Sequence, residues 1–186
     1  MVSTIAMKGA ILFDYTTQHW TAFFTAAFLL NLSPGPDIAF ILGQTLRGGR
    51  KAGFAAMSGI WTGAFVHVLF AAAGLSAILA TSATAFSVVK WIGAAYLVWL
   101  GVSALRSGGG KYSSEAERVS SSPLSIMRQG VLVSLMNPKV AIFFLAFLPQ
   151  FVVPDAGPTW AQLFLHGVLI IVVAAVVEPP LILLGE

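Results

Sequence analysis

Five long apolar segments alternate with polar connections along the chain. Each is about 20 residues long or longer, which is enough for an α-helix to cross a hydrocarbon core of ~30 Å. We expect these spans at residues Trp20–Leu46, Phe54–Ala80, Phe86–Leu105, Gln129–Val152 and Trp160–Leu184. The pattern predicts an all-α polytopic membrane helix bundle with five spans, in a single membrane domain over residues 1–186.

The stretch SGGGKYSSEAERVSSS separates the third span from the fourth. Its Gly, Ser and mixed charges are typical of a flexible loop. We therefore predict a first three-helix unit over residues 20–105, a cytoplasmic loop over 106–128, and a second unit over 129–186.

Positive charge predicts the orientation of the spans, because Lys and Arg are enriched in cytoplasmic connections. They gather after the first span and in or beside the loop after the third, at Arg47, Arg50, Lys51, Arg106, Lys111, Arg118 and Arg128. The N-terminus is then outside and the fifth span ends in the cytoplasm. DYTTQHW stands where a signal peptide would have small residues, so we expect a short external or interfacial tail before Trp20.

Composition agrees with the membrane class and limits the partners. The chain is 58% hydrophobic and 9% charged, with a mean hydropathy of +0.89, whereas soluble domains are about a quarter charged. The net charge of +3 is better explained by topology than by nucleic-acid binding. Membrane lipid is an expected partner and nucleic acid is not. Without cysteine, disulfides and thiolate metal sites are excluded.

The stretch NLSPGPDIAF, residues 31–40, interrupts the first span with unusual residues. Proline has no N–H to donate, and a buried carboxylate is costly unless it is paired. A related stretch lies in the fourth span: PDIAFILGQ, from Pro36, aligns with PKVAIFFLA, from Pro138, and each follows an asparagine, Asn31 or Asn137. Since the two spans have opposite predicted directions, they fit an inverted repeat of the transporter type.

Two helix interruptions at membrane depth predict a polar site, because irregular backbone is tolerated there only inside protein or along a cavity. Helix N-termini favour carboxylate groups, whereas freed carbonyls and an acidic side chain favour ammonium groups. An amino acid carries both groups. The predicted substrate-binding residues are Asn31, Pro34, Gly35, Pro36, Asp37, Asn137, Pro138 and Lys139.

Several of these residues also have a structural interpretation. Asp37 fits a cap for the half-helix that begins after the prolines. Lys139 fits an ammonium that extends toward the interface, or a partner that neutralises Asp37 or Glu178. The two asparagines favour bonds to backbone groups that the neighbouring prolines release.

Titratable side chains in the spans are candidates for proton coupling or gating. The candidates are Asp37, Glu178, His67 and His166. The two histidines are 99 residues apart (166 − 67), close to the 102 (138 − 36) between the aligned prolines. Histidine can relay protons, although a lone helical histidine is more often a packed residue. Glu178 precedes Pro179 and Pro180, which predicts a helix break, and it also fits an interfacial charge.

NLSPGPDIAFILGQTLRGGRKAGFAAMSGIWTG, with the later LVSLMNPKVAIFFLAFLPQFV, resembles the LysE/RhtB superfamily of lysine and homoserine/threonine exporters. The resemblance covers nearly the whole chain. It implies a bacterial inner-membrane secondary transporter that exports amino acids or close derivatives, coupled to protons and without a cofactor. Members of this family usually carry a sixth span, so a three-plus-two remnant of a three-plus-three inverted repeat is expected, with the second repeat incomplete.

Three other functions stay open: a cation exporter of the same superfamily, an intramembrane enzyme using Asp37, His67 and Glu178, and a nonfunctional truncated protein. Against the enzyme, neither H-E-x-x-H nor G-x-S-x-G occurs, and no metal site is expected. GIWTG, residues 59–63, has the small-xxx-small spacing that favours close helix packing and also fits a homodimer.

Overall fold

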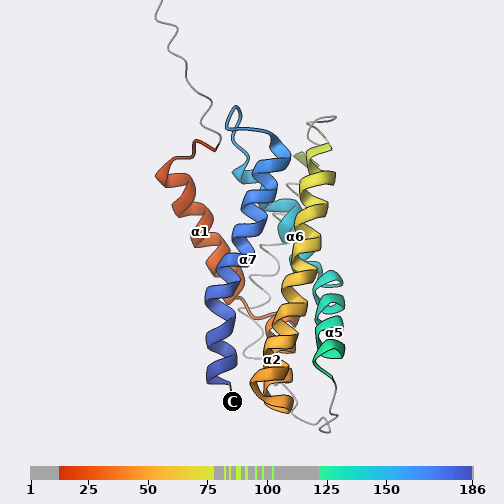
Figure 1. Cartoon of the computed structure of the whole chain (residues 1–186). Helices are drawn as coiled ribbons and strands as arrows, with labels where there is room; N and C mark the ends of the chain where they lie inside the picture. Colours follow the sequence, from red (N-terminus) through yellow and green to blue (C-terminus); the bar gives the residue numbers. More distant parts are fainter. Residues whose placement is uncertain are drawn as a thin grey trace, which may run out of the picture.

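The computed structural model describes residues 13–77 and 122–185, together with single positions between 82 and 102. Every regular element in this part of the chain is a helix, which confirms the predicted all-α class there (Figure 1). The elements are α1 (Thr17–Leu32), α2 (Pro36–Phe70), η1 (Ala71–Leu75), α5 (Pro123–Leu135), α6 (Pro138–Ala146), η2 (Leu148–Phe151) and α7 (Thr159–Leu184). The predicted third span, Phe86–Leu105, and residues 106–121 of the predicted loop lie largely outside the described residues.

The first predicted span, Trp20–Leu46, is divided between two helices. α1 begins after Thr16, whose side-chain oxygen accepts a hydrogen bond from the His19 N–H at 3.1 Å. It ends just before Pro34, which cannot continue a helix. α2 then starts with Pro36 in its first turn, where a missing N–H costs nothing. With 16 residues, α1 is about 24 Å long, so it is too short to cross the hydrocarbon core alone.

α2 reverses direction at Gly49. This residue has φ 68° and ψ −170° inside an otherwise helical segment, a conformation that glycine adopts without steric cost. Residues 45 and 53 would be ~12 Å apart along a straight helix, yet a Cβ added to Gly53 would touch the Thr45 hydroxyl. The first segment of α2 (residues 36–48) therefore folds back beside the second (residues 50–70), as the lower end of α2 shows in Figure 1. The predicted polar connection between the first two spans is a sharp kink rather than a loop.

A second interruption divides the predicted fourth span, Gln129–Val152. α5 starts earlier than predicted, because Ser122 caps it and Pro123 occupies its first turn. After a turn at Asn137 the chain continues as α6, which has Pro138 in its first turn. The axes before and after the turn differ by 52°. In Figure 1, α5 and α6 rise while α1 and the first segment of α2 descend, so the two interrupted segments run in opposite directions.

α7 is continuous from Thr159 to Leu184 and contains Pro179 and Pro180. The predicted helix break beside Glu178 is therefore wrong. Membrane helices tolerate proline because neighbouring groups and local adjustments satisfy the freed carbonyls. Glu178 consequently lies on one unbroken helix and is buried (4% exposed).

Glycine allows α2 and α5 to approach closely. A Cβ added to Gly59 would overlap the main-chain carbonyl of Met127, and one added to Gly130 would lie 2.7 Å from the Ala56 carbonyl oxygen. Backbones come this near only where side chains are absent or small. The motif at residues 59–63 therefore serves packing within the chain, and α5 covers its glycine face.

Two of the described helices are long and apolar enough to cross a membrane, Pro36–Leu75 and Thr159–Leu184. The bent pair of α5 and α6 with η2 adds a third crossing if it forms one span. The 40 residues of Pro36–Leu75 would extend ~60 Å as a straight rod, about twice the hydrocarbon core, which fits the reversal at Gly49. Large apolar side chains such as Phe70 and Val176 are exposed on the outside of the bundle. The total of five spans stays a prediction.

Candidate functional site

The two interruptions meet around one cavity, called here the central cavity. Its walls come from the end of α1, both segments of α2, the start of α6, and α7. The lining residues are Leu30, Asn31, Ser33, Gly35, Asp37, Ile38, Ile60, Trp61, Ala64, Lys139, Val140, Phe144, Ile170, Ile171, Ala174 and Glu178. The free volume is about 50 Å³, enough for only a few water molecules. The cavity is thus too small for an amino acid in this conformation.

Lys139 reaches from α6 to the end of α1. Its Nζ donates hydrogen bonds to the main-chain carbonyl oxygens of Ser33 at 2.6 Å and Leu30 at 3.2 Å. In an uninterrupted helix the Leu30 carbonyl would accept from the N–H of residue 34, which is proline. The ammonium therefore supplies a donor that Pro34 lacks. A Cβ at Gly35 would lie 3.3 Å from Lys139 Nζ, so glycine leaves room for the ammonium.

His67 bonds the helix end at the second interruption, as Lys139 does at the first. Its Nε2 lies 3.2 Å from the carbonyl oxygen of Ser134, whose helical donor would be residue 138, again a proline. The Asn137 N–H also donates to this oxygen, at 3.1 Å. Since a carbonyl only accepts, the hydrogen bond requires the proton on His67 Nε2. Each half of the chain thus provides a side chain that bonds the open helix end of the other.

Both asparagines bond the backbone, although not at the carbonyls that the neighbouring prolines release. Asn137 is buried and caps α6, because its Oδ1 accepts from the Lys139 N–H at 3.0 Å. Asn31 Nδ2 donates to the Ala27 carbonyl at 2.8 Å and also reaches the Ile170 carbonyl at 3.5 Å. Asn31 additionally lines the central cavity.

Asp37 lies in the first turn of α2 and faces the central cavity. The predicted capping role is wrong, because Gly35 is the N-cap residue and no side chain caps this end of α2. A helix N-terminus still favours a carboxylate in its first turn. Its Oδ1 is buried and has no hydrogen-bond partner among the described residues. Lys139 and His67 are close enough to act on the carboxyl group electrostatically, and the Asn137 side chain also lies near it. The free oxygen can accept a hydrogen bond from a group in the cavity.

Glu178 supplies a second carboxyl group from the opposite wall. It is 4% exposed, and its Oε2 accepts a hydrogen bond from Trp61 Nε1 at 2.6 Å. Asp37 and Lys139 act on it electrostatically across the cavity. The cavity therefore holds two carboxyl groups and one ammonium group within a largely apolar surface.

The prolines act through the backbone. The side chains of Pro34, Pro36 and Pro138 are exposed and do not line the central cavity. They remove hydrogen-bond donors and set where the half-helices begin and end. Of the predicted site residues, the structure places in the cavity wall Asn31, Gly35, Asp37, Lys139 and Glu178.

His166 lies apart from the central cavity, in an aromatic cluster with Tyr15, His19, Trp20 and Phe151. Its Nδ1 is 2.8 Å from the Gln162 carbonyl oxygen, and its Nε2 is 2.8 Å from Nε2 of His19. The carbonyl requires a proton on His166 Nδ1, so in neutral His166 the Nε2 accepts from His19. His67 and His166 consequently have different surroundings, despite their similar spacing in the two halves.

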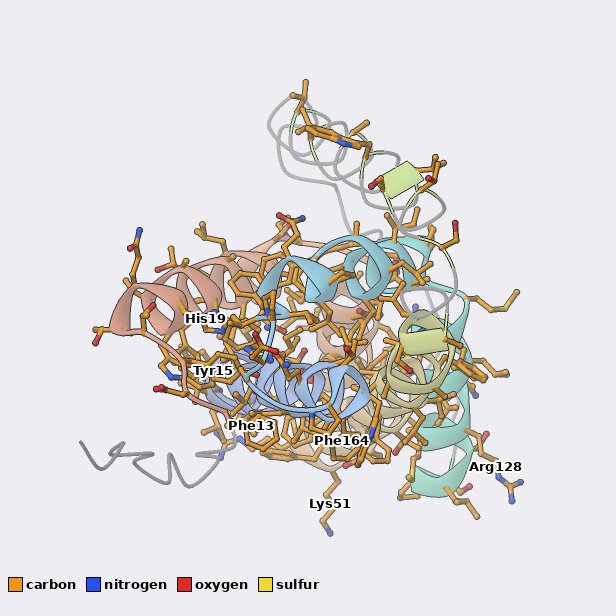
Figure 2. All side chains as sticks on the ribbon, turned by 90° about the horizontal axis from the view of Figure 1, so that it is seen from above. Phe13, Tyr15, His19, Lys51, Arg128 and Phe164 are labelled. Carbon is orange, nitrogen blue, oxygen red and sulfur yellow. The ribbon has the colours of Figure 1, made fainter. Side chains whose placement is uncertain are left out.

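Residues 14–19, predicted as a tail, are part of the packed structure. The Tyr15 ring stacks on His19 with centroids 4.3 Å apart, and the two lie side by side in Figure 2. The Tyr15 hydroxyl donates to Gln162 Oε1 at 3.1 Å. Burial raises the pKa of Tyr15 to about 12.

The sequence pattern of the LysE type translocators matches residues 28–185, a range that includes both interruptions and every residue of the cavity wall. The chain belongs to the LysE type translocator family. Members of the LysE family are transporters, so the chain is a membrane transport protein and not an enzyme.

Curated relatives in the LysE family carry names of efflux proteins. A homoserine/homoserine lactone efflux protein of Salmonella typhimurium is 33% identical over 87% of this chain and 78% of its own length. A leucine efflux protein of Enterobacter is 33% identical over 75% of this chain and 66% of its own. A leucine efflux protein of Klebsiella pneumoniae is 28% identical over 93% and 82%, respectively. No solved structure matches the chain.

Two contributors to this LysE-family site were missed from the sequence. Trp61 was read only as part of a packing motif, although a tryptophan within a span, away from the predicted interfaces, was a usable signal. Ser33 contributes its main-chain carbonyl, which no side-chain pattern reveals. Among the described residues, no group of three or more His, Cys, Asp or Glu side chains could hold a metal ion.

Proposed function

We propose that this chain exports amino acids or close derivatives across the bacterial inner membrane as a secondary transporter. The observation that carries the proposal is the central cavity, where Asp37, Glu178 and Lys139 face two interrupted helices. Membership of the LysE family, with relatives named for homoserine and leucine efflux, supports the same substrate class.

A zwitterion fits the distribution of charge in the cavity. The substrate ammonium is attracted by the Asp37 carboxylate and by the open carbonyls at the end of α1. The substrate carboxylate is attracted by the Lys139 ammonium and by the N-terminal turns of α2 and α6. The aliphatic walls, which include Ile60 and Ile171, favour an uncharged side chain.

Alternating access provides the transport cycle. Residues 20–105 form the first repeat and residues 129–186 an incomplete second repeat, and rocking between them exposes the cavity to either side in turn. The opposite directions of the two interrupted segments support this arrangement. The N-terminus is outside, the substrate enters from the cytoplasm, and a proton returns inward on Asp37 or Glu178. Neutralising an intramembrane carboxylate lowers the cost of moving it.

Export from cells loaded with candidate amino acids tests the function. We expect Asp37→Asn and Lys139→Met each to lower export about tenfold or more, because hydrogen bonds to charged groups contribute roughly 1.5–3 kcal/mol. Asp155→Asn and Lys51→Met are the matched controls, since Asp155 is an exposed loop residue and Lys51 points away from the bundle in Figure 2. Unchanged export in the double variant Asp37→Asn/Lys139→Met would contradict the proposed site.

A further inference from the structure

The end of α1 holds an ammonium group in the described conformation. Lys139 Nζ donates to two main-chain carbonyl oxygens, of Ser33 at 2.6 Å and Leu30 at 3.2 Å. Neither bond goes to a carboxylate, although Asp37 and Glu178 both act on Lys139 electrostatically. The ammonium is therefore fixed by hydrogen-bond geometry at a helix end rather than by a direct ion pair.

Three features make this helix end suited to a primary ammonium. The carbonyl dipoles at a helix C-terminus carry partial negative charge. Pro34 has no N–H for the Leu30 carbonyl, which accepts from the Ser33 N–H at 3.1 Å and keeps room for a second donor. Gly35 has no side chain, whereas a Cβ at this position would lie 3.3 Å from Lys139 Nζ. An ammonium has three donors, enough to bond both carbonyls and still face the cavity.

The free volume of the cavity leaves no room for a substrate beside Lys139 in this conformation. About 50 Å³ remains free beside Lys139, which suits a few waters and is too little for an amino acid. The Lys139 side chain is also partly exposed, so it has room to leave the helix end. A substrate amino group presents the same chemistry as Lys139 Nζ.

We propose that the carbonyls of Leu30 and Ser33 form a binding subsite for primary ammonium groups, and that Lys139 fills it when no substrate is bound. On binding, the substrate amino group replaces Lys139 Nζ, which then turns toward the substrate carboxylate. Lys139 thus fills the cavity when no substrate is bound and leaves it when a substrate binds. The ligand's identity as the exported amino acid rests on the proposed function, whereas the ammonium subsite itself does not.

The subsite can be tested with a simple amine and without transport. The full-length Lys139→Met protein keeps an unbranched apolar stem but leaves the subsite empty. We expect ethylammonium chloride to raise its Tm in detergent saturably, by the order of 2–4 °C. Tetramethylammonium has no N–H to donate, so its chloride at equal ionic strength should not raise the Tm. Wild-type protein, with the subsite filled, should respond equally weakly to both salts.

Several results would overturn the proposal. These are an equal response of Lys139→Met to both salts, no response to either, or a wild-type response to ethylammonium as large as that of the variant. Lys139→Met is tested during extraction if it does not fold in plain detergent. Ethylammonium, but not tetramethylammonium, must then restore the yield of folded protein. Failure to restore it also overturns the proposal. Absence of amino-acid export alongside a selective ethylammonium effect would reject the proposed function and leave the subsite standing.

Discussion

Lys139 Nζ lies 2.6 Å from the carbonyl oxygen of Ser33, so α6 is bonded to the broken end of α1. His67 makes the corresponding contact with the broken end of α5, at 3.2 Å from the Ser134 carbonyl. At each helix end, a side chain thus takes the place of a backbone donor that proline lacks. Each of the two donors reaches a helix end from a distant part of the sequence.

Replacing Trp61 with phenylalanine should destabilise the folded protein by about 1–3 kcal/mol, because the buried Glu178 carboxyl loses its indole donor. Denaturation in detergent measures the change. Trp160→Phe, at an exposed position on α7, is the matched control and should stay within about 0.5 kcal/mol of wild type. Trp61→Phe and Glu178→Gln should be clearly non-additive; strictly additive effects would show that the bond contributes nothing.

Gly59→Ala should destabilise the protein by about 1–3 kcal/mol, since its methyl group would overlap the Met127 carbonyl and push α5 away from α2. The matched control is Gly43→Ala, because a Cβ there meets nothing within 4 Å. It should be neutral or stabilising by up to about 1 kcal/mol through helix propensity. Thermal denaturation of the two variants side by side compares them, and equal stability would contradict the close contact of α2 and α5.

The sequence predicted the interruptions well, because proline acts locally. Pro36 and Pro138 begin helices as expected from their missing N–H groups, and both interruptions line one cavity with Asp37 and Lys139 in its wall. The family resemblance, carried by the residues around these prolines, was also confirmed.

Features that depend on long-range contacts were not predicted. The reversal at Gly49 falls in the predicted connection between the first two spans, but its form, a kink at one residue, was not predicted. α7 continues through Pro179, although proline usually breaks a helix. That rule holds better in water than in a membrane protein. The contacts of Tyr15 and His19 with residues 162–166 join segments more than a hundred positions apart, so a polar stretch at the start of the chain resembled a free tail.

Tyr15 should ionise with a pKa of about 12 instead of the ordinary 10.0, because burial disfavours the phenolate. The folded state then retains a proton that the unfolded state loses, so the stability linked to this group falls as pH rises from about 10 to 12. Phenolate absorbance of the wild type minus that of Tyr15→Phe isolates its titration. A midpoint near 10 would show that the Tyr15 hydroxyl is not buried in the folded protein.

A single thiol can show whether the cavity between the interrupted helices receives the exported molecule. The chain has no cysteine, so Ala64→Cys places a lone thiol in the cavity wall and Thr62→Cys places one on the exposed face of the same helix. Alkylation by a membrane-permeant maleimide is timed with and without an exported amino acid. We expect the amino acid to slow alkylation of Ala64→Cys severalfold and to leave that of Thr62→Cys unchanged. Equal rates at Ala64→Cys with and without the amino acid, in protein that still exports it, would show that the cavity does not receive it.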